Sequence, residues 1–331
     1  MASQSPVAVV TGASRGAGRG IAHALGGHGC VVYVTGRTER TGQSTLAGTI
    51  HETADMVCAA GGTGIAVAVD HADDEQVRAL IDRIQRDHGR IDILVNNAAL
   101  IRDEMMGRTR FWEEPINVID TLNVGLRSSY VATVLAAPLM IPNRKGLVAF
   151  TSASGSAHYM FGPAYGVAKA GTDKMAADTA VDFKAYGIAA VSIWMGTLLT
   201  QRVRDIVAAA PDKLGHILDN AETPELTGHI IWSLYNDPNL MDVTGRTLIG
   251  AELATHYGIT DEHGRQPPSC RDLHGVHPHP QFPRCAAIRH RLRPKPCAGG
   301  LLRPSPVRLL ESKGNRVRSA TARQTPKPPW C

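Results

Sequence analysis

The chain has 331 residues, of which 43% are apolar and 20% are charged, and its formal net charge is +5. This composition is typical of a globular protein and excludes a collagen-like repeat, a coiled coil and a small disulfide scaffold. The sequence contains no run of about 18 apolar residues, so no transmembrane helix is expected. No charged segment precedes the first apolar run, so no signal peptide is expected either.

The basic residues are concentrated near the C-terminal end. Residues 269–331 hold 13 Lys or Arg, 2 Asp or Glu, 10 of the 20 prolines and 4 of the 6 cysteines, which leaves residues 1–268 mildly acidic. We therefore expect one globular domain over residues 1–268 and a disordered Pro/Arg-rich tail over residues 269–331. Only Cys30 and Cys58 lie in the first part, which favours a reducing, cytoplasmic compartment.

Three other interpretations of the tail stay open. Its four cysteines and four histidines are candidate zinc ligands, although they lack the close paired spacing of structural zinc sites. Its arginines are candidates for nucleic-acid binding, although its aromatic residues are only Phe282 and Trp330. The third is an extension read in an alternative frame. We expect no metal, no nucleic acid and no membrane as partners of the chain.

Short β-branched runs alternate with helical patterns in the first 200 residues. Strands are expected at residues 7–11, 31–35, 65–69, 91–95, 147–151 and 189–194, and helices at about 17–28, 50–60, 74–88, 114–140 and 164–186. Thr49 and Glu52 form the capping box of the second helix. Such alternation predicts an α/β fold with a doubly wound parallel sheet of the Rossmann type. A sheet of this type binds its ligand at the carboxyl ends of the strands.

A glycine-rich turn, Thr11-Gly12-Ala13-Ser14-Arg15-Gly16-Ala17-Gly18, follows the first expected strand. Glycines in this position permit a tight turn, let the backbone approach a pyrophosphate and let the helix pack closely on the sheet. The pyrophosphate would lie on the free N–H groups of the helix N-terminus. Because the turn lies between the first strand and the first helix, it predicts a dinucleotide site.

The spacing G-x-x-x-G-x-G after a threonine resembles that of the short-chain dehydrogenase/reductase family. The resemblance covers about residues 6–260. The other matching positions are Asp70, the segment Asn96-Asn97-Ala98-Ala99, Asn123, Ser152, Tyr165 and Lys169. Softer matches at residues 32–37, 123–127 and 221–228 resemble the subgroup that contains dehydrogenase/reductase family member one.

The resemblance implies a catalytic set of Ser152, Tyr165, Lys169 and Asn123. Tyr165 and Lys169 are at i and i+4, so their side chains share one helix face. A free tyrosine has a pKa of about 10, and the nearby ammonium of Lys169 favours the phenolate. We therefore expect Tyr165 to be the general acid in reduction and the general base in oxidation. Ser152 would hydrogen-bond the substrate oxygen, and Asn123 would anchor a relay water to Lys169.

The second expected strand ends in Thr35-Gly36-Arg37, with no acid to accept from the adenosine ribose. Arg37 can pair with a 2′-phosphate through two hydrogen bonds, and Arg15 can reach the same phosphate. The alternative is two solvated arginines, one of them paired with Glu39. We predict NADP(H), with NAD the less favoured cofactor. The expected cofactor-binding residues are Gly12, Ser14, Arg15, Gly16, Gly18, Arg37, Asp70, Asn97, Tyr165, Lys169, Gly196, Thr197 and Thr200.

The chain departs from the family pattern after the sixth strand, where Met195-Gly196 stands in place of Pro-Gly. Gly196 keeps a permissive turn, but the fixed φ of proline is lost. Two rival serines, Ser154 and Ser156, miss the family spacing and rank below Ser152. The side chains of His158 and Tyr159 are interpreted as substrate-lining or structural. The apolar side chains that hint at a hydrophobic substrate, and are equally good packing residues, are Met160, Phe161, Leu198, Leu199 and Ile206.

Taken together, these residues predict an oxidoreductase that transfers a hydride between NADP(H) and a carbonyl or secondary alcohol. The alternative is a cofactor-binding sensor or scaffold protein without turnover, with the tail as a partner-binding arm. A nucleic-acid binder that depends on the tail ranks third. Family resemblance implies a homodimer or homotetramer formed through the helices at 114–140 and 164–186.

Overall fold

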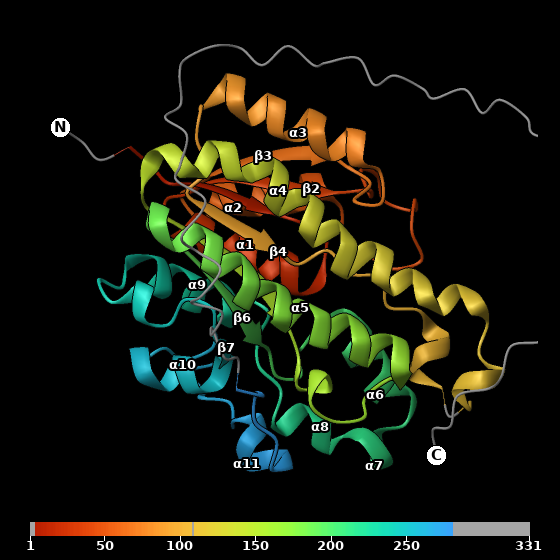
Figure 1. Ribbon diagram of the computed structural model, residues 1–331. Coiled ribbons are helices and arrows are strands. Elements are labelled where there is room, and N and C mark those ends of the chain that lie inside the picture. Colours follow the sequence, from red (N-terminus) through yellow and green to blue (C-terminus); the bar gives the residue numbers. More distant parts are fainter. Residues whose placement is uncertain (1–3, 108, 281–331) are drawn as a thin grey trace, which may run out of the picture. The chain divides into compact units, whose positions relative to one another are not determined.

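The structure is a computed structural model that describes residues 4–107 and 109–280 (Figure 1). Those residues lie in the first of two compact units, Met1–Arg284, and the second unit, Cys285–Cys331, falls outside the described residues.

Within the described residues, one sheet of seven parallel strands has the order β3-β2-β1-β4-β5-β6-β7. Its strands are β1 (Val7–Val10), β2 (Val31–Gly36), β3 (Thr63–Ala68), β4 (Ile93–Asn96), β5 (Gly146–Ser152), β6 (Ile188–Trp194) and β7 (Thr247–Ile249). The predicted doubly wound parallel sheet is confirmed, and β7 is an addition to the strands that the sequence predicts. The strand order reverses between β1 and β4, which is where a sheet of this type forms its ligand-binding crevice.

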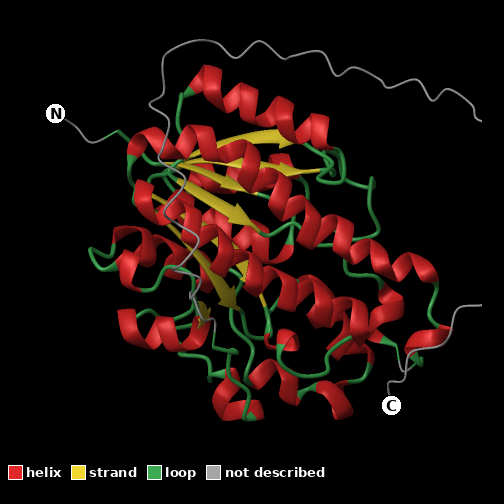
Figure 2. Ribbon diagram, viewed as in Figure 1, coloured by secondary structure: helices red, strands yellow, loops and turns green. Residues whose placement is uncertain are grey.

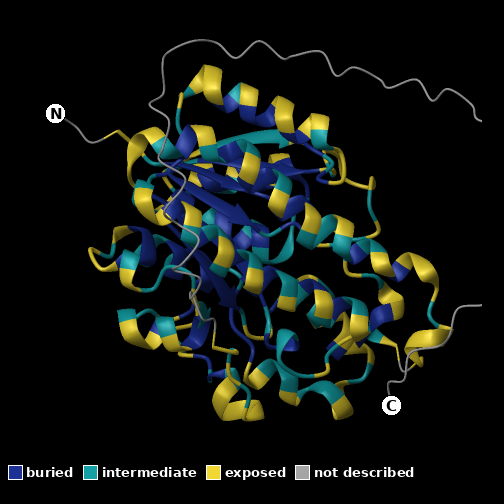
Figure 3. Ribbon diagram, viewed as in Figure 1, coloured by how far each residue is buried: buried dark blue, intermediate teal, exposed yellow. Residues whose placement is uncertain are grey.

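Helices cover both faces of the sheet (Figure 2). One face carries α1 (Gly16–Gly27), α2 (Ile50–Ala59), α9 (Leu226–Asn236) and α10 (Gly250–Tyr257), and the other carries α3 (Asp74–Asp87), α4 (Ser128–Met140) and α5 (Gly162–Phe183). Successive residues of a strand point to opposite faces, so Val9 packs under α3 to α5 while Val10 packs under α1 and α9. Both faces are therefore buried (Figure 3), which explains the near-continuous apolar strands.

The predicted capping box at the start of α2 is confirmed. The hydroxyl of Thr49 accepts a hydrogen bond from the main-chain N–H of Glu52 at 3.0 Å, and the carboxylate of Glu52 accepts from the N–H of Thr49 at 3.2 Å. Two N–H groups at the helix N-terminus are thereby satisfied.

The predicted helix at 114–140 is wrong in its first half. A 3₁₀ turn spans Ile116–Ile119, and in the wide turn Leu122–Arg127 the residues Val124 and Gly125 leave helical geometry. The φ of Gly125 is +148°, a value that glycine reaches without a steric penalty. The regular helix α4 therefore begins only at Ser128.

The stretch Ile116–Asn143, which includes α4, is long and apolar enough to cross a membrane by length and composition. In this structure Ala132, Ala136 and Leu139 of α4 are buried in the core beneath the sheet. Packing in the core thus accounts for the apolar residues on the buried side of α4.

The described chain continues beyond residue 268 into the short helix α11 (Cys270–His274). The hydroxyl of Ser269 donates to Glu252 of α10 at 2.8 Å, and the guanidinium of Arg271 donates to the same carboxylate at 2.9 Å. These contacts attach the first residues of the basic segment to α10. Residues 281–331, including the candidate zinc ligands Cys285, His290, Cys297 and Cys331, lie outside the described residues. Among the residues that are described, no group of His, Cys, Asp and Glu is arranged to hold a metal ion.

Candidate active site

The glycine turn forms a cradle at the carboxyl end of β1. Gly12 has a φ of +66°, and a Cβ placed on it would lie 2.7 Å from the Cα of Ala98. A Cβ on Gly18 would lie 2.4 Å from the carbonyl oxygen of Gly12. Within the described residues no side chain caps the N-terminus of α1, and its first turn carries no acid. The turn therefore offers main-chain N–H groups to an anion at close range.

Asn97, one of the predicted cofactor-binding residues, holds this turn from the neighbouring strand. Its amide nitrogen donates to the carbonyl oxygens of Thr11 at 2.9 Å and Gly12 at 3.2 Å. The hydroxyl of Thr11 in turn accepts from the N–H groups of Asn97 and Ala98. The carboxyl ends of β1 and β4 are thus joined at the point where the strand order reverses.

The two predicted cofactor arginines lie together beyond the end of β2. The guanidinium of Arg15 donates to the hydroxyls of Ser44 and Thr38, each at 2.7 Å. Burial, with a smaller contribution from the nearby charge of Arg37, lowers the pKa of Arg15, which still stays protonated. Arg37 is exposed and lies 3.8 Å from Asp70, so its partner is Asp70 and not Glu39. Ser14 lies against the end of β2, beside Gly36.

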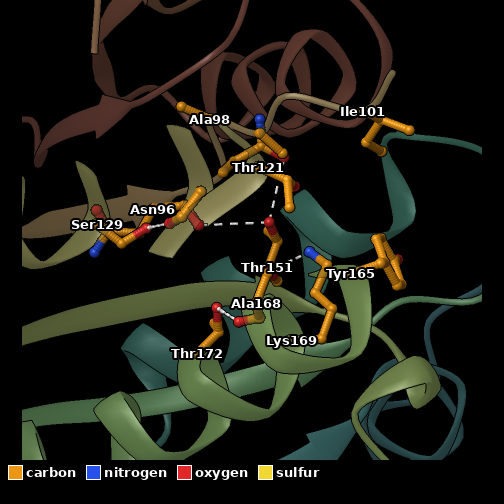
Figure 4. Close-up of a pocket in the computed structure, with 13 residues that line it drawn as sticks. Asn96, Ala98, Ile101, Thr121, Ser129, Thr151, Tyr165, Ala168, Lys169 and Thr172 are labelled. Carbon is orange, nitrogen blue, oxygen red and sulfur yellow. Dashed lines mark hydrogen bonds between the residues drawn. The ribbon is translucent and has the colours of Figure 1, made fainter. Parts of the chain in front are cut away.

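Three of the four predicted catalytic residues lie on β5 and α5: Ser152 ends β5, and Tyr165 and Lys169 lie on α5 (Figure 4 shows Tyr165 and Lys169). Ser152 ends β5 and is fully buried, with its hydroxyl donating to the carbonyl oxygen of Lys169 at 3.4 Å. The ammonium of Lys169 donates to the carbonyl oxygen of Thr151 at 3.2 Å and lies 5.6 Å from the centre of the Tyr165 ring. The pair on one helix face is therefore present in the geometry that the i, i+4 spacing predicts.

Burial dominates the charge states of this pair. It raises the pKa of Tyr165 to about 12 and lowers the pKa of Lys169 to about 8, and the negative charge of Asp173 opposes the second shift. Loss of hydration raises the pKa of an acid such as tyrosine and lowers the pKa of a base such as lysine, and both shifts have this direction. In this structure Tyr165 therefore carries its proton at neutral pH.

The structure does not bring Asn123 into this group. Its side chain is exposed in the wide turn before α4. The cavity beside Tyr165 and Lys169 is instead lined from this region by Thr121, Gly125 and Ser129.

The departure from the family pattern after β6 gives one additional main-chain hydrogen bond. The N–H of Met195, which a proline would lack, donates to the carbonyl oxygen of Ser152 at 3.1 Å. Gly196 and Thr197 are exposed. Thr200 caps α6 (Gln201–Ala209), and its methyl group would lie 3.7 Å from a Cβ on Gly16. The loop at 196–200 therefore approaches the glycine turn from β6.

Ser154 and Ser156, the rivals of Ser152 for the role of catalytic serine, form hydrogen bonds with other side chains. The hydroxyl of Ser154 shares a hydrogen bond with the ring of His158 at 3.0 Å, and the hydroxyl of Ser156 donates to Asp173 at 2.6 Å. Tyr159 is 78% exposed. Of the three serines, Ser152 is therefore the one that lies at the end of β5 and contacts Lys169.

Asp173 is a residue that sequence reasoning missed. It is buried one helical turn beyond Lys169, and its carboxylate accepts hydrogen bonds from Ser156 at 2.6 Å, Ser192 at 2.6 Å and the indole of Trp194 at 2.8 Å. It thereby ties α5 to β6 and to the turn after β5. Its signal in the sequence was an acid four residues after Lys169 on the buried face of the helix.

Apolar side chains cover the ring of Tyr165 in this structure. Met105 and Val118 form a buried cluster with Tyr165, and the ring of Phe161 meets the tyrosine ring edge-on at 5.2 Å. The cavity left beside Tyr165 and Lys169 measures about 20 Å³, which is room for about one water molecule. Of the other apolar candidates, Leu199 is buried, while Ile206 is exposed.

Met105 and Val118 belong to a cover of irregular structure. Its described residues, 101–107 and 109–120, contain three 3₁₀ turns, Asp103–Met106, Phe111–Glu113 and Ile116–Ile119. Arg202 of α6 forms an ion pair with Asp103 and donates to the carbonyl oxygen of Ile101 at 3.1 Å. The cover and α6 are therefore joined by one arginine.

A doubly wound sheet with a glycine cradle, a Tyr-x-x-x-Lys pair and a buried serine defines a nucleotide-binding oxidoreductase. The sequence model described as short chain dehydrogenase matches residues 6–210, and the chain belongs to this family. Members of the family use nicotinamide dinucleotides and act on small molecules, so the chain is an enzyme of the short-chain dehydrogenase/reductase type.

Named relatives support this assignment. The chain is 38% identical to dehydrogenase/reductase SDR family member 1 of Mus musculus and of Homo sapiens, over 78% of this chain and 84% of each relative. It is 28% identical to hydroxysteroid dehydrogenase-like protein 2 of Xenopus tropicalis, over 83% of this chain and 61% of the relative.

Solved structures agree with the fold. A protein of Xanthomonas campestris described as a dehydrogenase superposes with a TM-score of 0.67 at 26% identity, over 80% of this chain and 94% of that chain. A short chain dehydrogenase of Mycobacterium thermoresistibile superposes with a TM-score of 0.64 at 23% identity, over 77% and 88%.

Proposed function

We propose that the chain is an NADP(H)-dependent carbonyl reductase in which Tyr165 is the proton donor. The observation that carries this proposal is the buried, protonated Tyr165 beside the ammonium of Lys169 and the buried hydroxyl of Ser152. A phenol that keeps its proton is suited to donating it to a carbonyl oxygen that gains negative charge. The reverse reaction, oxidation of a secondary alcohol, would use the same residue as base.

The residues present fit a dinucleotide. Gly12 and Gly18 let the turn pack closely against Ala98 and Asn97, and the uncapped N-terminus of α1 would hold the pyrophosphate. Lys169 and the loop at 196–200 would hold the nicotinamide riboside. When bound, the reduced cofactor supplies the hydride.

The preference for NADP(H) rests on charge. β2 ends at Gly36, and the next side chain is Arg37, beside the half-buried guanidinium of Arg15. Two cations favour a 2′-phosphate, which an acid at this position would repel. Arg37 lies 3.8 Å from Asp70 and would exchange this carboxylate for the phosphate.

Other parts of the proposal concern the substrate and the assembly. The side chains of Met105, Val118 and Phe161 around Tyr165 support an apolar carbonyl compound as substrate. Exposed Tyr130 and Val167, on α4 and α5, support a homodimer or homotetramer formed through these helices.

The test compares binding and turnover in one set of variants. Purified protein is titrated with NADPH and NADH, and a panel of apolar ketones and aldehydes is screened for NADPH oxidation. We expect tighter binding of NADPH, loss of that preference in Arg37→Asp, and a loss of about 100-fold or more in kcat in Tyr165→Phe with cofactor affinity retained. Preference of the wild type for NADH would overturn the cofactor assignment. Full turnover by Tyr165→Phe would overturn the role of the tyrosine, and cofactor binding with no turnover on any carbonyl would favour the sensor interpretation.

A further inference from the structure

The carboxyl group of Glu222 is buried without a partner. Only 1% of the residue is exposed, and within residues 4–107 and 109–280 neither carboxylate oxygen has a hydrogen-bond partner. Burying a carboxylate without hydrogen bonds is costly, so such a group calls for a physical explanation.

The main chain of Glu222 is paired with the loop that follows β6. Its N–H donates to the carbonyl oxygen of Thr197 at 2.8 Å, and its carbonyl oxygen accepts from the N–H of Leu199 at 2.8 Å. These bonds enclose a parallel bridge between Leu198 and Glu222. A displacement of Glu222 would therefore be transmitted directly to residues 197–199.

The side chain supports the same loop. A Cβ on Gly196 would lie 2.8 Å from Oε2 of Glu222, so the carboxyl fills the space that a side chain at 196 would need. The φ of Gly196 is not in the left-handed region, so glycine is required here for close approach and not for conformation. Gly196 and Thr197 are exposed while the carboxyl is buried, which places the carboxyl behind the loop rather than in the open cleft.

We propose that Glu222 is a positioning residue whose buried carboxyl supports the loop at 196–200 in the conformation that holds the nicotinamide end of the cofactor. This proposal rests on the proposed function, because it is that function which places the nicotinamide at the loop. Glu222 lies behind the loop, so its effect is on cofactor affinity and not on the proton transfer by Tyr165.

The charge state of Glu222 makes this support dependent on pH. Burial raises the pKa of Glu222 to about 7, the main-chain N–H of Gly196 opposes part of the shift, and the charge of Asp261 adds to it. The groups that face it are already engaged, since Asp261 pairs with Arg265 and Arg265 donates to the carbonyl oxygen of Ala221.

The sign of the effect follows from these contacts. Below pH 7 the carboxyl is neutral and packs under Gly196. As the pH rises through 7, the carboxylate forms with no described cation beside it and with only the main-chain N–H of Gly196 to offset its charge, so it has to draw in water or move the loop. Cofactor affinity should therefore fall on the alkaline side, by up to about tenfold for each pH unit above the pKa in the free protein.

The experiment measures the dissociation constants of NADPH and NADH from about pH 6 to about pH 9. Glu222→Gln keeps the shape of the side chain and cannot ionise. The matched control is Glu225→Gln, three residues further on, where the carboxylate faces His23 of α1. We expect affinity to fall as the pH rises through about 7 in the wild type and in Glu225→Gln, whereas Glu222→Gln should lose affinity only from about pH 8, where Lys169 at the same end of the cofactor loses its charge. Among catalytic parameters the cofactor KM should change with pH, while kcat should not change through this group.

A second measurement needs no cofactor. Infrared difference spectra of the wild type between acid and alkaline pH should contain the C=O stretch of a protonated carboxyl that disappears as the pH passes 7 and is missing from Glu222→Gln. Equal loss of affinity in Glu222→Gln and the wild type would overturn the positioning role, as would an infrared spectrum without that band. If neither cofactor binds the wild type at any pH, the proposed function fails, and the infrared titration still decides the charge state of Glu222.

Discussion

The cofactor side and the substrate side of this site are built in different ways. On the cofactor side, β1 and β4 end where α1 begins, and main-chain geometry at Gly12 and Gly18 sets the shape, with Asn97 joining the strands. On the substrate side, Tyr165 is covered by short turns, and the ion pair of Arg202 with Asp103 joins segments about a hundred residues apart in the sequence.

The difference has a physical consequence. A main-chain turn enclosed by parallel strands has few alternative conformations, because any shift breaks several hydrogen bonds together. A cover held by exposed ion pairs and a small apolar cluster opens at a much lower cost. The first region is therefore suited to binding one fixed dinucleotide, and the second to admitting a substrate to a tyrosine that is covered in this structure.

The largest expected effect comes from breaking the cofactor side with Gly18→Ala. The new Cβ would lie 2.4 Å from the carbonyl oxygen of Gly12 and 2.5 Å from the amide nitrogen of Asn97, so the turn has to move. We expect a loss of cofactor affinity of about 100-fold and a loss of about 1–3 kcal/mol in the free energy of unfolding. Cofactor titration and denaturant unfolding measure the two effects.

The control for this substitution lies on the same helix. A Cβ on Gly27 would have no described atom within 4 Å, so Gly27→Ala should bind cofactor normally and be as stable as the wild type or more stable. Unchanged affinity in Gly18→Ala would mean that the close approach at Gly18 does not set the shape of the site.

An intermediate effect is expected where the two sides meet, at Asp173. The carboxylate of Asp173 accepts three hydrogen bonds, whereas the amide of Asp173→Asn has only one oxygen that can accept. The substitution also removes the negative charge that raises the pKa of Lys169. The ammonium of Lys169 is lost as the pH rises through its pKa of about 8, so the alkaline limb of the kcat profile should move to lower pH. At pH 8 we expect a loss in kcat of up to about tenfold.

The comparison for Asp173→Asn is Asp178→Asn on the same helix, where the carboxylate is exposed and pairs with Lys174. This control should keep the wild-type pH profile. If Asp173→Asn lowers stability but leaves the alkaline limb in place, Asp173 is a structural residue with no influence on Lys169.

The sequence predicts the sheet, the glycine turn and the placing of Tyr165 beside Lys169, because the signals for these features are local. The glycine spacing, the alternation of strands and helices, and the i, i+4 relation of Tyr165 and Lys169 each depend on residues that are close in the chain. The cover and the buried acids carry no such signal. Nothing near Met105 or Val118 in the sequence indicates that they pack on Tyr165, and the burial of Glu222 depends on a loop more than twenty residues away.

The helix predicted at 114–140 shows the limit of periodicity. An apolar pattern continues through Val124 and Gly125, but the main chain turns there, because glycine allows a φ of +148°. That turn directs Thr121 and Gly125 to the cavity and leaves Asn123 exposed. Helical periodicity identifies the element, and tertiary packing decides where the regular helix begins.

The smallest effect is expected from Arg202→Met, which loosens the cover without changing the cofactor cradle. The substitution removes the ion pair with Asp103 and the hydrogen bond to the carbonyl oxygen of Ile101, and it keeps an apolar stem of similar length. Asp103 is 91% exposed, so the pair contributes at most about 1 kcal/mol, which limits the change to about fivefold. We expect the KM of the carbonyl substrate to rise about two- to fivefold, with cofactor affinity unchanged.

The exposed ring of Trp112 in the cover reports on the same event. Its fluorescence should be more readily quenched by acrylamide in Arg202→Met, because a cover released from α6 spends more time open. Arg204→Met, on the exposed side of the same helix, should match the wild type in both measurements. An equal loss of cofactor affinity and substrate affinity in Arg202→Met would contradict the division into two regions, because it would show that the cover and the cradle move together.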